Sequence, residues 1–111
     1  MAFDPTGFSI STSDRDGRAV VVVRGELDLA TAPDLEAVVT ELLDEGQDVV
    51  VDLRELAFMD STGLRALVAA HARVEGTEQR LLLVRPRPGA AIERILAIAG
   101  VESVLDLIDD V

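Results

Sequence analysis

Hydrophobic positions follow two different periods along the chain, and the changes from one to the other predict its strands and helices. Apolar, mostly β-branched runs predict buried strands at residues 19–24, 49–53 and 81–84, and alternation with serine predicts a half-exposed strand at 8–12. Apolar residues spaced i, i+3, i+4, i+7 and i+8, from Leu35 to Leu43, are typical of one face of an amphipathic helix. Helices are predicted from Thr31 to Gly46, at 61–74 and at 90–99, each ending near a glycine.

The order of these elements predicts a single α/β domain over residues 1–111, with a loose start at 1–7. The sequence Asp14-Arg15-Asp16-Gly17 predicts a turn that joins the first two strands as a hairpin. Strands then alternate with helices, which indicates parallel pairs in a small mixed sheet of four to five strands backed by helices. Residues 104–108 fit either a last strand or a short helical end.

Composition and charge exclude several kinds of partner. The 111 residues carry a formal net charge of −11, so nucleic acid and anionic membranes are poor partners, whereas a basic patch on a protein would be attracted. The same charge is also explained by solubility alone. With three phenylalanines as the only aromatic residues, the chain has no obvious platform for stacking bases.

Cysteine and targeting features point to a cytoplasmic protein. The chain has no cysteine, which excludes disulfides, thiol catalysis and cysteine metal ligands. Its start has neither a basic segment nor a long apolar segment, so we expect no signal peptide. No apolar run approaches the roughly 20 residues that a membrane helix needs.

Motifs for catalysis are missing, and we expect no catalytic residue, metal or cofactor. With no lysine the usual phosphate loop is impossible, and neither a dinucleotide fingerprint nor a nucleophile elbow is present. His71, the only histidine, falls on the apolar face of its helix and is predicted to be a packing residue. A triad through Ser61 and His71 is excluded because ten helical residues span about 15 Å.

Two aspartates each follow an apolar strand and precede a helix. If the strands before Asp28 and Asp60 are parallel neighbours, both carboxylates lie at one edge of the sheet, where function collects in open α/β folds. Glu26 could join them. Three roles stay open for this group: capping of the helices, a protein contact surface, or a metal site.

The stretch "FMDSTGLRA", residues 58–66, crowds hydroxyls and a glycine into a helix start. Ser61 is expected at or beside the helix N-terminus with an exposed hydroxyl, as an N-cap or as a phosphorylation site. Gly63 costs helix stability, and its missing side chain would let another backbone or a catalytic loop come close. A phosphate on Ser61 is expected to meet free helix N–H groups, while adding negative charge beside Asp60 and Asp28.

Two motifs together resemble a known family. "VRGELDLATAPDL" at 23–35 and "VVVDLRELAFMDSTGLRAL" at 49–67 are similar to the STAS domain of bacterial anti-sigma-factor antagonists, and the resemblance covers nearly the whole chain. It implies a small mixed sheet backed by helices and a binding protein, not an enzyme. The implied partners are an anti-sigma factor that is also a serine kinase, and a PP2C-type phosphatase.

The resemblance also assigns residues. The phosphoacceptor would be Ser61, with Thr62 the less well matched hydroxyl. The residues of the partner-binding surface would be Asp28, Thr31, Asp60, Ser61, Thr62, Gly63, Leu64 and Arg65. Phosphorylation would release the kinase and end the freeing of the sigma factor. The alternative is a STAS subunit that stays bound in a stress-sensing or lipid-transport complex without phosphorylation. The oligomeric state does not follow from the sequence.

Overall fold

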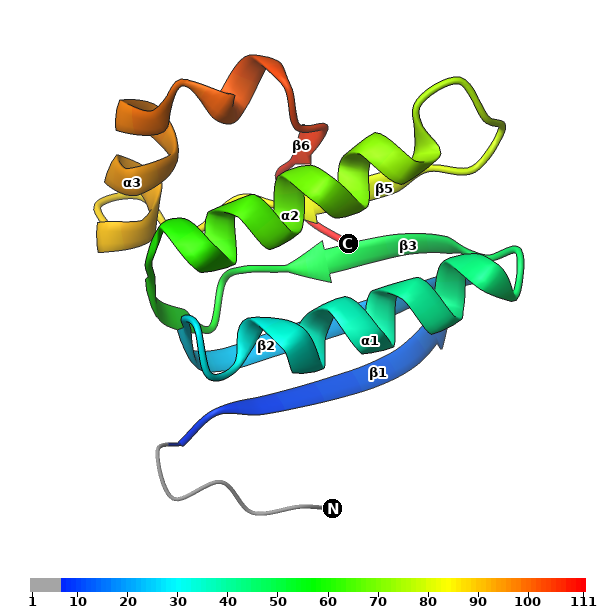
Figure 1. Ribbon diagram of the computed structural model, residues 1–111, viewed down its shortest axis with the longest axis horizontal. Coiled ribbons are helices and arrows are strands. Elements are labelled where there is room, and N and C mark those ends of the chain that lie inside the picture. Colours follow the sequence, from blue (N-terminus) through cyan, green and yellow to red (C-terminus); the bar gives the residue numbers. More distant parts are fainter. Residues whose placement is uncertain (1–6) are drawn as a thin grey trace.

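The computed structural model describes residues 7–111, so most of the predicted loose start lies outside the described residues. Figure 1 shows the order of the elements along the chain. The strands are β1 (Ser9–Arg15), β2 (Arg18–Leu27), β3 (Asp48–Asp52), β4 (Leu56–Met59), β5 (Leu81–Val84) and β6 (Leu107–Ile108). The helices are α1 (Ala32–Asp44), α2 (Ser61–Val74), α3 (Ala91–Ala99) and the 3₁₀ turn η1 (Val101–Ser103).

All six strands form one mixed sheet. The order is β1-β2-β3-β5-β6, and β4 pairs with β2 beyond the point where β3 ends. Only the β1–β2 pair is antiparallel, and it closes through Asp16 and Gly17, whose φ angles are 54° and 82°. Positive φ at both central residues is what a tight hairpin turn requires, and Asp–Gly supplies it. The α/β fold and the hairpin predicted from the sequence are therefore confirmed.

The helices cover one face of the sheet. In Figure 1, α1 and α2 lie side by side; α1 packs on β2 and β3, and α2 on β4 and β5. Their apolar faces close the main core, whose largest fully buried side chains include Leu27, Leu35, Leu67 and Leu83. A second, smaller cluster of buried residues lies on the opposite face, where Ile108 and Val111 pack against it: Val20, Val50, Leu82 and Val84. The central strands are thus buried on both faces, as their apolar runs predicted.

Two elements differ from the prediction. Strand β4 was anticipated only as the apolar run before Asp60 and was not counted as a separate strand, because four residues with only the first and last buried give no alternation to detect. Its presence raises the sheet from the expected four or five strands to six. The ambiguous segment 104–108 ends in the two-residue strand β6, and the helical turn η1 lies directly before it. The bounds of α2 match the prediction at both ends, and Gly100 ends α3 with a φ of 70°.

A backbone contact joins the start of α2 to the end of β2. Gly63 is buried, and a Cβ added there would lie 2.8 Å from the carbonyl oxygen and the Cγ of Leu27, and 2.8 Å from the Cγ of Met59. A real Cβ does not approach other heavy atoms that closely. The backbone that the missing side chain admits is therefore the chain's own, which gives Gly63 a structural reason.

A buried carboxylate anchors the C-terminal segment. Asp52, 5% exposed at the end of β3, accepts hydrogen bonds from Arg54 Nε (3.0 Å) and Nη2 (2.8 Å), and Arg54 Nη1 reaches Asp110 at 3.1 Å. Burial raises the pKa of the Asp52 carboxyl, but the hydrogen bonds and charge of Arg54, with the charge of Arg24, outweigh it and hold the pKa below its ordinary value. The same bonds raise the pKa of Arg54.

Replacing Gly63 with alanine should destabilise the fold although alanine is the better helix former. The added methyl group overlaps the Leu27 carbonyl, which cannot move without disturbing the β2–β4 pairing, so Gly63→Ala should lower the free energy of unfolding by about 1–3 kcal/mol. Ala69 is exposed on the same helix, and there Ala69→Gly should cost about 1 kcal/mol by helix propensity. Urea unfolding measures both. A Gly63→Ala protein more stable than wild type would show that the close contact is not maintained.

Replacing Arg54, which pairs with the buried Asp52, should lower the free energy of unfolding more than replacing an arginine of an exposed ion pair. Arg54→Gln leaves a buried carboxylate with fewer donors, so the free energy of unfolding at pH 7 should fall by about 1–3 kcal/mol. Because the pKa of Asp52 is lowered by folding, this difference should be fully present at neutral pH and narrow as the pH falls below about 4. Arg87→Gln, which breaks the exposed pair with Glu55, should change stability by no more than about 1 kcal/mol. Equal losses in the two variants would contradict the role given to Asp52.

Candidate functional site

The predicted carboxylates lie at one edge of the sheet. β2 and β4 run parallel with Leu27 opposite Met59, so the next residues, Asp28 and Asp60, leave the sheet together. The Asp60 N–H donates to the Leu27 carbonyl at 3.1 Å, which extends the pairing to the helix start. The prediction that these aspartates follow parallel neighbouring strands is therefore confirmed.

Asp28 and Thr31 hold the loop between β2 and α1. Asp28 Oδ1 accepts the N–H groups of Ala30 (3.0 Å) and Thr31 (3.2 Å), which forms a tight turn. The Thr31 hydroxyl accepts the Asp28 N–H at 2.9 Å and lies 2.8 Å from the Glu26 carbonyl oxygen, to which it donates. Thr31 occupies the N-cap position of α1, yet its side chain makes no bond into the helix. It is 7% exposed, so it shapes the predicted partner surface from beneath.

Asp60 is the side-chain cap of α2. Its Oδ1 accepts the N–H groups of Thr62 at 2.8 Å and Gly63 at 3.2 Å, and its carbonyl accepts the Leu64 N–H. A carboxylate at this position also complements the positive end of the helix dipole. Of the roles left open, helix capping is thus observed for Asp60, whereas the Asp28 side chain holds the loop that precedes α1. The described residues contain no group of three potential metal-binding side chains.

Ser61 is the first residue of α2 and is exposed. Because Asp60 already caps the helix, the Ser61 hydroxyl is not the N-cap, and it makes no hydrogen bond with any residue in the described range 7–111. Thr62 and Leu64 are half-buried, and Leu64 packs against the main core. Arg65, one turn after Ser61, is exposed.

Only part of the helix start is free to meet a phosphate on Ser61, although the sequence led us to expect free N–H groups there. Asp60 Oδ1 already accepts the N–H groups of Thr62 and Gly63, whereas the N–H of Ser61 makes no hydrogen bond within residues 7–111. A phosphate would therefore compete with a carboxylate already in place, and it would add roughly −1.5 to −2 charges beside it.

Sequence reasoning missed an apolar residue at this edge. Leu29, in the loop after Asp28, is 75% exposed, the second largest exposure among the large apolar side chains of residues 7–111. Phe58 of β4 is also exposed, and it lies opposite Glu26 in the β2–β4 pairing. Leucine at the tip of a polar loop breaks the pattern of the preceding strand, and that break was the available signal. We define the junction surface as the exposed or half-buried residues Asp28, Leu29, Asp60, Ser61, Thr62, Leu64 and Arg65.

His71 is buried in α2, as predicted from its place on the apolar face. Its Nδ1 lies 3.5 Å from Glu75 Oε1 and its Nε2 lies 3.6 Å from Asp106 Oδ2. Neither distance is a good hydrogen bond, and Nδ1 has no hydrogen-bond partner. The two nitrogens face different carboxylates, so the three side chains do not converge on one point.

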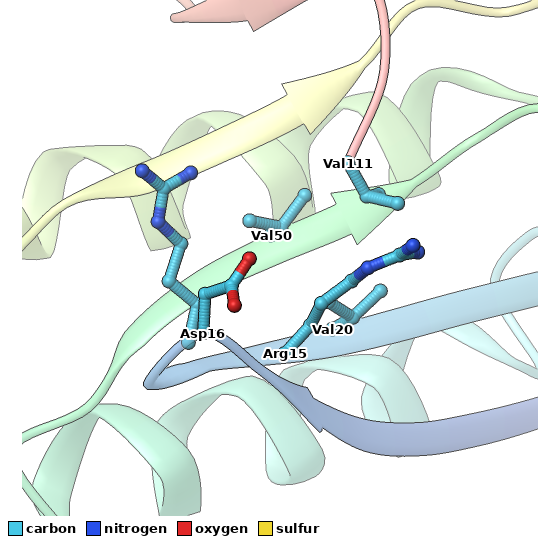
Figure 2. Close-up of a pocket in the computed structure, with 6 residues that line it drawn as sticks. Arg15, Asp16, Val20, Val50 and Val111 are labelled. Carbon is cyan, nitrogen blue, oxygen red and sulfur yellow. The ribbon is translucent and has the colours of Figure 1, made fainter.

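A small hollow lies at the other end of the sheet. Figure 2 shows Val111, from the C-terminal segment, near Val50 of β3, with the hairpin residues Arg15 and Asp16 beside them. The hollow has a volume of about 140 Å³, well below the 300 Å³ or more of a typical ligand pocket, and no residue of the junction surface lines it.

None of the helices within residues 7–111 combines the length and the apolar character needed to cross a bilayer.

Comparison with known proteins gives one consistent family. Residues 10–108 match the sequence model of the domain family described as "Mlab, STAS domain". The anti-sigma-B factor antagonist of Staphylococcus aureus is 32% identical over 98 residues, which cover 87% of this chain and 89% of that protein. The anti-sigma-F factor antagonist RsfB of Mycobacterium tuberculosis is 28% identical over 93% of this chain and 83% of its own length.

A solved structure of an anti-sigma factor antagonist has the same fold as this chain. The crystal structure of an anti-sigma factor antagonist from Mycobacterium paratuberculosis superposes with a TM-score of 0.84 at 29% identity, covering 97% of this chain and 91% of that one. The resemblance carried by the two sequence motifs is thereby confirmed. The chain belongs to the STAS-domain family, and the relatives that it matches over most of its length are anti-sigma factor antagonists.

Proposed function

We propose that this protein is an anti-sigma-factor antagonist whose binding is switched off by phosphorylation of Ser61. In the unphosphorylated form it binds, in the cytoplasm, an anti-sigma factor that is also a serine kinase, and the bound sigma factor is released. The similarity to antagonists over most of the chain supports the binding role. The observation that supports the switch is that Ser61 is exposed at the junction surface while Asp60 does the work of capping.

The chemistry of the switch belongs to the partner. The Ser61 Oγ attacks the γ-phosphorus of ATP bound to the kinase, and a new O–P bond forms as the bond to the β-phosphate oxygen breaks. ADP leaves, and the hydroxyl proton passes to a base of the kinase. A PP2C-type phosphatase hydrolyses the phosphoester and resets the protein. The antagonist supplies a reachable hydroxyl on a rigid helix end and no catalytic group.

Electrostatics explains why a phosphate would end binding. The N–H groups of Thr62 and Gly63 at the start of α2 are already bonded to Asp60, so most of the phosphate charge stays outside the helix and adds to the charges of Asp60 and Asp28. A contact surface that fits a serine hydroxyl closely would then have to desolvate a dianion beside two carboxylates. Both the steric and the electrostatic change act against the same partner.

A second function is favoured by the description of the matched family, which names Mlab. In that case the junction surface would bind a subunit of a transport complex permanently, and Ser61 would not be modified. Affinity purification of the tagged protein from its own cells separates the two. Recovery of a sigma-factor regulator supports the antagonist, whereas recovery of a transporter ATPase supports the permanent subunit.

Incubation with the cognate kinase and ATP should add one phosphate, about 80 Da, to Ser61. Ser61→Ala should block the modification and change stability by less than about 0.5 kcal/mol, because the hydroxyl makes no hydrogen bond within residues 7–111. Ser61→Asp should weaken kinase binding, and Thr62→Ala should still be phosphorylated. Mass spectrometry of peptides and calorimetric titration measure these effects. Undiminished binding by Ser61→Asp, together with no phosphate on the wild type, would reject the switch.

Leu29 should be an anchor of partner binding. Its exposed side chain loses water contact only in a complex, so Leu29→Ala should weaken binding about tenfold or more while leaving the thermal midpoint of the free protein unchanged. Val104 is an aliphatic side chain 45% exposed in the turn after η1, and Val104→Ala is the matched control, with no change in affinity expected. Equal affinities for the two variants would place the partner elsewhere.

A further inference from the structure

Arg65 is an arginine of the junction surface whose charge is not balanced by any carboxylate of the described residues. It is exposed on α2, whose 14 residues include no carboxylate, and it forms no ion pair with any of residues 7–111. The other arginine of this helix, Arg73, pairs with Asp44 of α1 at 2.7 Å. Arg65 follows Ser61 by four residues, so the two side chains leave the helix on the same face, with Cβ atoms roughly 6 Å apart.

The neighbours of Ser61 leave a phosphate little choice of partner. The Asp60 side chain occupies the N–H groups of Thr62 and Gly63, which leaves the N–H of Ser61 itself as the donor at the helix start that makes no hydrogen bond within residues 7–111. Glu26 and Asp28, which lie at the same edge of the sheet as the end of β4, are anionic. A cation within one helical turn is therefore the main group that could balance the new charge.

We propose that Arg65 is the internal counter-ion of phosphorylated Ser61: its guanidinium pairs with the phosphate across one turn of α2. The inference rests on the proposed phosphorylation of Ser61 and specifies how the modified state is held. An anion four residues before a cation is the more favourable orientation of a helical pair. The planar guanidinium also donates two parallel hydrogen bonds to phosphate oxygens.

The pairing has two consequences for the switch. It offsets part of the repulsion among the phosphate, Asp60 and Asp28, so that phosphorylation does not unfold the start of α2. It also turns Arg65 from a free cation of the junction surface into a bound one, so a partner loses a positive contact when it meets the phosphate. Glu36 of α1 lines a shallow hollow with Ala69 and Arg73 of α2, and Arg65 is not among the residues that line it.

The test is a phosphorus NMR titration of the full chain with phosphoserine incorporated at position 61 during translation. The second pKa of phosphoserine lies near 6, and a neighbouring cation lowers it by favouring the dianion. Arg65→Gln should therefore raise this pKa by about 0.3 pH units, as expected for one helical ion pair. The increase should shrink in 1 M salt, where the Debye length is about 3 Å. Arg65→Lys should restore most of the effect at low salt.

Two control variants test whether the change in the phosphate pKa is specific to Arg65. Arg73→Gln lies 12 residues beyond Ser61 on the same helix and should leave the phosphate pKa unchanged. Arg94 lies on α3, which packs against β4, and Arg94→Gln should also have no effect. No shift in Arg65→Gln, or a larger shift in Arg94→Gln, would overturn the proposal.

The result separates this inference from the proposed function. Since the phosphate is introduced by translation, the titration reads the pairing whether or not a kinase modifies Ser61. If no kinase phosphorylates Ser61, the proposed switch is rejected, but the titration result is not affected. If the phosphate pKa is the same with and without Arg65, only the proposal that Arg65 is the counter-ion is rejected.

Discussion

The contact between Gly63 and the Leu27 carbonyl is the constraint on which the functional edge depends. With a side chain at position 63, the first turn of α2 could not approach the end of β2 at this distance. Because it does approach, the Asp60 N–H reaches the Leu27 carbonyl and extends the β2–β4 pairing into the helix start. The loop after β2 and the first turn of α2 thereby become one surface, and residues 32 positions apart in the chain, Asp28 and Asp60, share it.

Most of the fold could be predicted because its signals are local and strong. The apolar runs of β2, β3 and β5 are buried on both faces, and the period of α2 fixes its two ends correctly. Strand β4 was anticipated only as an apolar run and β6 only as one of two alternatives, because four and two residues carry no period and their existence depends on pairing with β2 and β5. Such short strands are set by neighbours distant in sequence, which a local pattern cannot contain.

The sequence predicted which residues lie at this edge of the sheet, but it did not predict the hydrogen bonds that they form. That Asp28 and Asp60 each follow a strand sufficed to place them at one edge, but which donors they accept depends on the turn that each loop adopts. Thr31 illustrates the difference: it stands at the N-cap of α1, yet its hydroxyl faces back to Asp28 and Glu26 because the Asp28 turn already holds the loop. Gly63 was assigned to the approach of another backbone, and only the folded chain identifies that backbone as Leu27.

The cap at Asp60 also determines how a modification at Ser61 would be felt. An uncapped helix start offers free N–H groups that draw a phosphate inward and neutralise part of its charge. Here two of those groups, the N–H groups of Thr62 and Gly63, are already bonded to Asp60, so the same phosphate would keep most of its charge on the outer surface. A change of nearly two charges that remains outside is a change that a partner meets directly. In the proposed switch, the residue that stabilises the helix would therefore also keep the charge of a phosphate on Ser61 where a partner meets it.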